Sequence, residues 1–199
     1  MVTRLKGDVT YAPKGRDSRP VQNFMKVHQG DRFELPADGV LQVVYFENGR
    51  KASWKGPAEF EAGIKEKSRG AQSGASVSEL PQDVSKEIRR VSLLVDMSRL
   101  QRTGSSQVRG GDSDENKTLP PSLPLREEDE KVVDAARKRY ETLRKEADPQ
   151  DITPEMYLFS IMADYDQFEE MKTLIQKMRE RQPDNDQVDL ISEWFEGQI

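Results

Sequence analysis

The residues that most often carry out nucleophilic or acid–base catalysis are scarce in this sequence. Of its 199 residues, His28 is the only histidine, and none is a cysteine. A catalytic histidine needs a nucleophile and an orienting group, and the chain has no Gly-x-Ser-x-Gly motif. Without cysteine there are no disulfides or thiolate metal sites. We therefore interpret His28 as a surface or turn residue, and we do not expect an enzyme.

A short acidic run is the best match to a metal-binding motif. Asp112–Asn116 places oxygen ligands at positions 1, 3 and 5 of a calcium loop. However, the glycine expected at position 6 is Lys117, and the glutamate expected at position 12 is Leu123. The favoured interpretation is a solvated acidic linker. We expect no metal and no other cofactor.

Two aromatic residues have the chemistry for binding sugars. Trp54 and Tyr45 offer a flat apolar ring with a polar group, which suits stacking on a carbohydrate. In a short hairpin such residues more often form a cross-strand core, and we favour that interpretation. A glycan- or peptidoglycan-binding module is the alternative, and it requires exposed rings.

The elements that carry these residues differ along the chain. Residues 2–62 have the alternating pattern of short strands, with no clear helical period. The apolar run Val40–Phe46 leads into Asn48-Gly49, a pair that favours a type I′ hairpin turn. Residues 63–80 are rich in glycine and serine, and we interpret them as a linker. The first segment, 1–62, is thus expected to be a small all-β domain.

A single amphipathic helix is expected in the middle of the chain, at 81–103. Val84, Ile88, Val91 and Val95 recur at helical spacing and form one apolar face. A short amphipathic helix is marginally stable alone in water, so this face either packs on the β module or docks into a partner. We therefore count Ile88, Val91 and Val95 as candidate interaction residues. A polar linker is expected at 104–125.

The last segment, 126–199, has helical periodicity throughout. Val132, Ala136 and Tyr140 belong to the stripe of the first of its helices, and Thr153-Pro154 begins the next one. Trp194 and Phe195 lie on a short final helix and are further candidate interaction residues. The expected fold class is α+β in separate modules: a small all-β N-terminal domain, a central amphipathic helix, and an all-α C-terminal bundle or TPR-like hairpin.

Short glycine-centred motifs in the β segment are similar to those of a known family. They are Gly7-Asp8-Val9, Gly30-Asp31-Arg32-Phe33 and the strand Val40–Phe46 leading into Asn48-Gly49-Arg50. On these residues the segment resembles the FecR domain, extending to residue 110 if Val108-Arg109-Gly110 is the family's trailing Arg-Gly element. The resemblance implies a β-rich, mostly extracytoplasmic bacterial module, found in regulators of sigma factors and in adhesion or envelope proteins.

The helical segment resembles a degenerate tetratricopeptide (TPR) arrangement. Pro149 and Pro183 lie 34 residues apart, which is the length of that repeat. Phe159 and Met171 depart from the family's small residues, and at most one and a half repeats fit. A plain helical bundle is nearly as well supported. The methionines of this segment are expected in its core.

Charge and composition complete the functional expectation. The net charge is −5, which disfavours a nucleic-acid partner. Residues 126–199 carry 11 basic and 20 acidic side chains, and so differ from the slightly basic remainder. We expect no transmembrane span in this chain, and because Val2 already lies in a strand pattern, a targeting segment is expected before Met1.

From these patterns we expect a periplasmic or outer-membrane-associated scaffold or accessory subunit. It would bind protein partners, expected to be subunits of an envelope complex of the motor or secretion type. A FecR-type signalling regulator, with a membrane segment upstream of Met1, is the remaining alternative.

Overall fold

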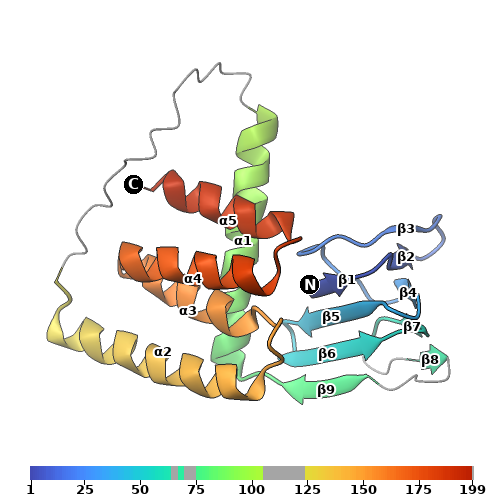
Figure 1. Cartoon of the computed structure of the whole chain (residues 1–199), viewed down its shortest axis with the longest axis horizontal. Coiled ribbons are helices and arrows are strands. Elements are labelled where there is room, and N and C mark those ends of the chain that lie inside the picture. Colours follow the sequence, from blue (N-terminus) through green and yellow to red (C-terminus); the bar gives the residue numbers. More distant parts are fainter. Residues whose placement is uncertain (64–66, 70–74, 105–123, 199) are drawn as a thin grey trace. The chain divides into compact units, whose positions relative to one another are not determined.

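The computed structural model describes residues 1–63, 67–69, 75–104 and 124–198. These residues form two antiparallel sheets and five helices, so the expected α+β fold class is confirmed (Figure 1). The chain divides into two compact units, Met1–Lys86 and Glu87–Ile199. Both sheets belong to the first unit. The calcium-like run at 112–116 and most of the linker expected at 104–125 lie outside the described residues.

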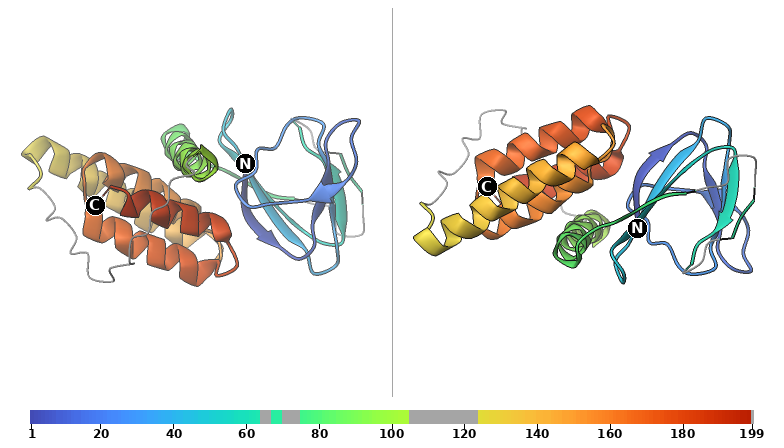
Figure 2. Two further views of the ribbon diagram at one scale, coloured as in Figure 1. Left: turned by 90° about the horizontal axis from the view of Figure 1, so that it is seen from above. Right: turned by 90° about the horizontal axis from the view of Figure 1, so that it is seen from below.

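The two sheets of the first unit face each other and enclose one core (Figure 2). The first sheet has four strands in the order β1-β5-β6-β9, and the second has five in the order β3-β2-β4-β7-β8. All their pairings are antiparallel. The bounds are β1 Val2–Lys6, β2 Thr10–Ala12, β3 Arg19–Pro20, β4 Arg32–Leu35, β5 Val40–Tyr45, β6 Arg50–Lys55, β7 Ala58–Glu61, β8 Lys67–Arg69 and β9 Ser76–Glu79.

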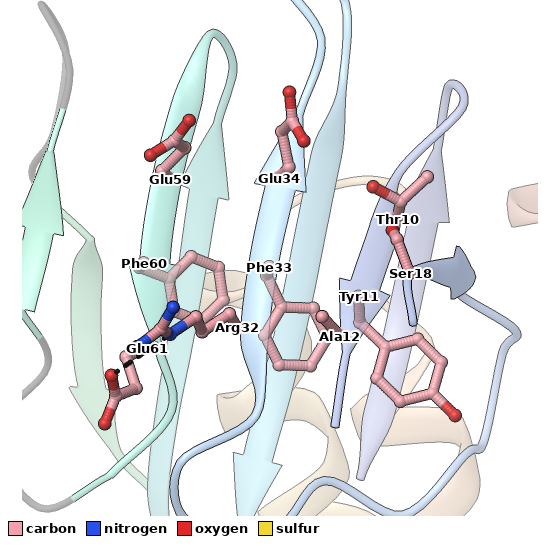
Figure 3. A pocket seen from close by; sticks show the side chains of 10 residues that line it. All are labelled: Thr10, Tyr11, Ala12, Ser18, Arg32, Phe33, Glu34, Glu59, Phe60 and Glu61. Carbon is pink, nitrogen blue, oxygen red and sulfur yellow. Dashed lines mark ion pairs between the residues drawn. The ribbon is translucent and has the colours of Figure 1, made fainter. Parts of the chain in front are cut away.

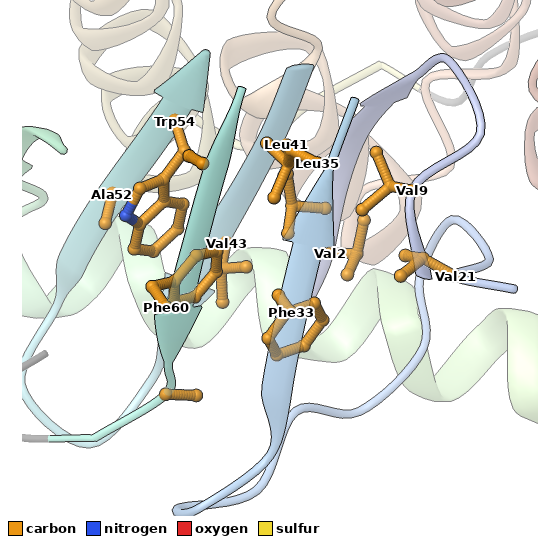
Figure 4. Close-up of a cluster of buried hydrophobic side chains, with 12 residues drawn as sticks. Val2, Val9, Val21, Phe33, Leu35, Leu41, Val43, Ala52, Trp54 and Phe60 are labelled. Carbon is orange, nitrogen blue, oxygen red and sulfur yellow. The ribbon is translucent and has the colours of Figure 1, made fainter. Parts of the chain in front are cut away.

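Aromatic rings form the centre of this core. Trp54 and Phe60 stack face to face across the two sheets, with ring centroids 3.8 Å apart and planes 4° from parallel (Figure 4). Phe60 stacks in turn on Phe33 at 4.9 Å, and Phe33 stacks on Tyr11 at 5.9 Å. The strand alternation predicted from the sequence therefore points the large apolar residues inward.

The hairpin between β5 and β6 differs from the predicted type I′ turn. Tyr45 pairs with Arg50, so the loop has four residues rather than two. Only Gly49 in this loop has a positive φ, of 65°, and Asn48 instead accepts a hydrogen bond from the Arg50 amide at 3.1 Å. A longer loop that ends in a left-handed glycine replaces the tight turn, in which both central residues would need positive φ.

The expectation of a linker at 63–80 was wrong for two parts of this segment, because β8 and β9 lie within it. The sequence Ser76–Glu79 has little apolar pattern, and all four of its side chains are exposed. Its conformation comes from pairing with β6, where Ala52 lies opposite Val77. Such non-local pairing leaves almost no signal in the local composition.

Helix α1 (Gln82–Gly104) matches the helix expected at 81–103. The other helices are α2 (Glu127–Glu146), α3 (Thr153–Asp164), α4 (Phe168–Arg181) and α5 (Asp186–Glu196). In α2 the predicted apolar stripe was wrong by one residue at its start, because Val132 is 46% exposed whereas Val133 is buried. Positions 133, 136 and 140 lie on one helical face with i, i+3, i+7 spacing.

Helix α3 is the most buried element of the helical unit. Nine of its residues are buried, including Met156, Met162 and the carboxylate-bearing Glu155. Its neighbours along the chain, α2 and α4, both pack against it. Met171 and Met178 of α4 are also buried, so the expectation of a methionine-rich core is confirmed. None of the described helices has the length and apolar character needed to cross a membrane.

Candidate functional site

His28 lies at a surface turn. Its side chain is 77% exposed, and its Nδ1 atom is 3.7 Å from Oδ2 of Asp31. The same oxygen of Asp31 accepts a hydrogen bond from the backbone amide of His28 at 2.8 Å. Asp31 therefore fixes the turn, and the geometry accounts for both residues without a substrate.

The two aromatic candidates for sugar binding are not presented to solvent as flat surfaces. Trp54 is 1% exposed because its ring is stacked in the core on Phe60. Tyr45 is half-buried, with the Arg50 guanidinium 5.8 Å from its ring centroid. The glycan alternative required an exposed ring at one of these positions. The burial of Trp54 counts against it.

A shallow trough lies on the five-stranded sheet and has a volume of about 420 Å³ (Figure 3). Its walls include Glu34 and Glu59, which lie directly opposite each other on β4 and β7. A second pair on the same two strands is Arg32 and Glu61. The Nε atom of Arg32 lies 3.7 Å from Oε2 of Glu61. The trough therefore combines three carboxylates with the aromatic residues Tyr11, Phe33 and Phe60. No cluster among the described residues has three or more side chains suited to hold a metal ion.

A second hollow, of about 410 Å³, lies between α2 and α4 over the buried Leu158 of α3. Two contacts cross it. Arg137 of α2 donates to Glu170 of α4 at 2.8 Å, and the Lys177 ammonium lies 5.5 Å from the centre of the Tyr140 ring. The hydrogen bonds to Glu170 raise the pKa of Arg137. Two pairs of lining side chains, Arg137–Glu170 and Tyr140–Lys177, thus already contact each other across the hollow.

Glu155 is the centre of a buried polar network in the helical unit. Its side chain is fully buried and accepts hydrogen bonds from Arg144 at 3.2 Å and from Arg181 at 3.0 Å. The Tyr140 hydroxyl also donates to it, at 3.3 Å. Burial, followed by the negative charge of Glu155, raises the pKa of Tyr140 to about 12.

The same arginines hold the loop between α2 and α3. Arg144 donates to the carbonyl of Asp151 at 2.5 Å, and Arg181 donates to that of Pro149 at 2.6 Å. Arg144 also donates to the carbonyl of Ala147, the residue that follows α2, at 3.2 Å. The arginine side chains thus supply hydrogen bonds to the end of α2 and to the loop after it. The network therefore has a structural role, joining α2, α3 and α4.

The candidate residues of the central helix lie on its buried face. Ile88 and Val91 are fully buried, and Val95 is 1% exposed. Two polar contacts attach this helix to α3: Ser160 donates to Glu87 at 2.7 Å, and Arg90 forms a two-pronged ion pair with Asp164. The hydrogen bonds to Asp164 raise the pKa of Arg90. These contacts join α1 to the helical unit of its own chain.

The opposite face of α1 is exposed. Leu93 is 48% exposed and Met97 is 53% exposed, and they lie one turn apart. Lys86 and Arg89 are exposed on the same side, towards the start of the helix. We call these four residues the outer face of α1. Sequence reasoning missed it because it searched for a single apolar stripe, although the spacing of positions 93 and 97 signals a second one.

The candidates on the last helix belong to the core of the helical unit. Phe195 is 4% exposed, and its ring lies 6.4 Å from that of Phe168. Trp194 is half-buried and meets Phe159 edge-on at 6.0 Å. These contacts explain both residues as packing between α5 and the preceding helices.

The chain was also compared with known proteins. No protein family, curated protein or solved structure matches it. The resemblances to the FecR domain and to TPR repeats therefore stay predictions based on the residues that suggested them.

Proposed function

We propose that this chain is a non-enzymatic scaffold or accessory subunit that binds other proteins in a bacterial envelope assembly. The observation that carries the proposal is the outer face of α1. Two large apolar side chains, Leu93 and Met97, are about half exposed there. Among the described residues, they form the only pair of exposed large apolar side chains at helical spacing.

The way α1 is held supports a binding role. Its inner face is buried through Ile88 and Val91, and its polar contacts to α3 fix its position in the helical unit. A helix held in this way presents an outer apolar face that is already ordered. Binding through this face therefore costs less conformational entropy than binding through a free helix that must first become ordered.

The place of action rests on the resemblance to the FecR domain, which implies an extracytoplasmic bacterial module. The assembly type, motor or secretion, rests on the same analogy. Protease treatment of intact cells and of cells with a permeabilised outer membrane tests this part. If the protease digests the chain in intact cells, or only after the outer membrane is permeabilised, the result supports an extracytoplasmic location. Protection until the inner membrane is lysed contradicts it.

Affinity purification from native cells tests the docking surface itself. The tagged chain is compared with Leu93→Lys and Met97→Lys, and proteins bound to each are identified by mass spectrometry. A matched control is Val77→Lys, because Val77 of β9 is 48% exposed, as is Leu93. We expect the two α1 variants to lose specific partners that the Val77 variant keeps. If the α1 variants keep every partner, the proposed docking surface is wrong.

A further inference from the structure

We infer that the outer face of α1 binds helix α2 of a second copy of this chain. The inference rests on the proposed function, since it takes the same face as the docking surface and names its occupant. The charge and spacing of the exposed residues on the two helices support it.

On α1 the outer face has a basic end and an apolar end. Lys86, Arg89, Leu93 and Met97 follow one another at three- and four-residue steps, which keeps them on one side of a helix. Arg89 precedes Leu93 by four residues, a rise of about 6 Å. A complementary surface must therefore offer an acidic group about one turn before an apolar one.

Helix α2 has such a surface on its exposed side. Val132 is 46% exposed, and Ala135 is also exposed. Glu128 is exposed four residues before Val132, a rise of about 6 Å that equals the step from Arg89 to Leu93. Glu127 is paired with Lys131 at 3.2 Å, whereas Glu128 has no ion pair within the described part of the chain.

The two faces fit each other with the helices side by side and parallel. Arg89 then lies opposite Glu128, Leu93 lies opposite Val132, and Met97 lies opposite Ala135. The apolar contacts remove exposed surface from water, and the charged pair at the rim sets the register and favours this partner over others.

Each copy carries both faces, so the α1–α2 contact can form in two ways. It can occur twice about a two-fold axis and give an isologous dimer, or it can continue head to tail from copy to copy as a heterologous chain. In both cases the purified protein has a mass above that of the monomer. Because the charged residues are exposed, association weakens as salt screens them.

Light scattering after size-exclusion chromatography of the full chain tests the inference. The wild type is measured over a concentration series at low and raised salt. It is compared with Arg89→Glu, with Glu128→Arg and with an equal mixture of the two variants. Lys172→Glu and Glu180→Arg on α4 serve as controls with the same changes of charge at exposed positions.

We expect the wild type and both α4 controls to associate, and each single α1 or α2 variant to lose association, because its own copies then present like charges. The equal mixture should recover it, since the glutamate at position 89 of one variant meets the arginine at position 128 of the other. A monomeric wild type at all concentrations overturns the inference, as does a mixture that stays monomeric.

Failure of this inference is distinguishable from failure of the proposed function. A chain that is monomeric alone but loses native partners on Leu93→Lys retains the docking surface, with another protein as its occupant. Association that persists in Arg89→Glu places any contact between copies elsewhere on the molecule and overturns the inference.

Discussion

Arg181 of α4 donates from its Nε atom to Oε1 of Glu155 on α3, at 3.0 Å, although Glu155 is fully buried. A buried carboxylate is costly to remove from water unless its hydrogen bonds are satisfied. Here Arg144 and Tyr140 supply the remaining bonds. The relationship places one charge where three helices meet, and it makes their packing depend on that charge.

Glu155→Gln is expected to destabilise the chain by about 3 kcal/mol, because it leaves two partly buried arginines without their shared carboxylate. The free energy of unfolding from urea titration followed by circular dichroism at helical wavelengths measures this. Glu180→Gln is the control, since Glu180 is exposed on α4 and its loss should cost less than about 0.5 kcal/mol. Equal effects of the two changes would show that the network contributes little.

Gly49→Ala is expected to cost more than Gly15→Ala. Both glycines have positive φ, at 65° and 74°, so alanine is strained by about 1–2 kcal/mol at either position. At Gly49 the added Cβ would also lie 2.3 Å from the carbonyl oxygen of Leu80, whereas at Gly15 nothing lies within 4 Å. Unfolding free energies of the two variants make the comparison. A Gly15 variant as unstable as the Gly49 variant contradicts the predicted clash.

The two tryptophans should differ in their access to solvent. Trp54 is 1% exposed in the β unit, and Trp194 is half-buried in the helical unit. In Trp194→Phe, which leaves Trp54 as the only tryptophan, we expect weak quenching of fluorescence by iodide. Trp54→Phe should show stronger quenching. The opposite order would place Trp54 at the surface and restore the glycan alternative.

Stability at alkaline pH should depend on Tyr140. Burial raises the pKa of Tyr140 from its ordinary value of 10.0 to about 12, so the folded state keeps its proton where the unfolded state loses it. The stabilisation from this shift is complete below pH 10 and is lost as pH rises towards 12. Unfolding free energies across this range should therefore fall more steeply for the wild type than for Tyr140→Phe. Parallel curves would contradict a raised pKa.

The elements that could be predicted from the sequence are those with strong local periodicity. The spacing of Val84, Ile88, Val91 and Val95 correctly gave both the position of α1 and its buried face. Pro154 correctly marked the start of α3. Alternation around Phe33 indicated a strand whose large side chain points inward, and the structure places it in the aromatic core.

Features that depend on distant partners could not be predicted in the same way. The polar segment Ser76–Glu79 becomes a strand because β6 offers it an edge. Two valines are adjacent near the start of α2, and local spacing does not distinguish which of them faces the core. Packing against the neighbouring helices buries Val133 and leaves Val132 exposed. The role of Glu155 left no local pattern in the sequence, because the arginines that bind it lie 11 and 26 residues away along the chain.

The unequal burial of α2 and α3 has a consequence for the order in which the helical unit opens. Only Val133 and Ala136 of the 20 residues in α2 are buried, against nine of the 12 in α3. Local opening costs least where few apolar groups are covered. Backbone amides of α2 should therefore exchange with deuterium earlier than those of α3, and this edge of the unit is where the native fold begins to melt.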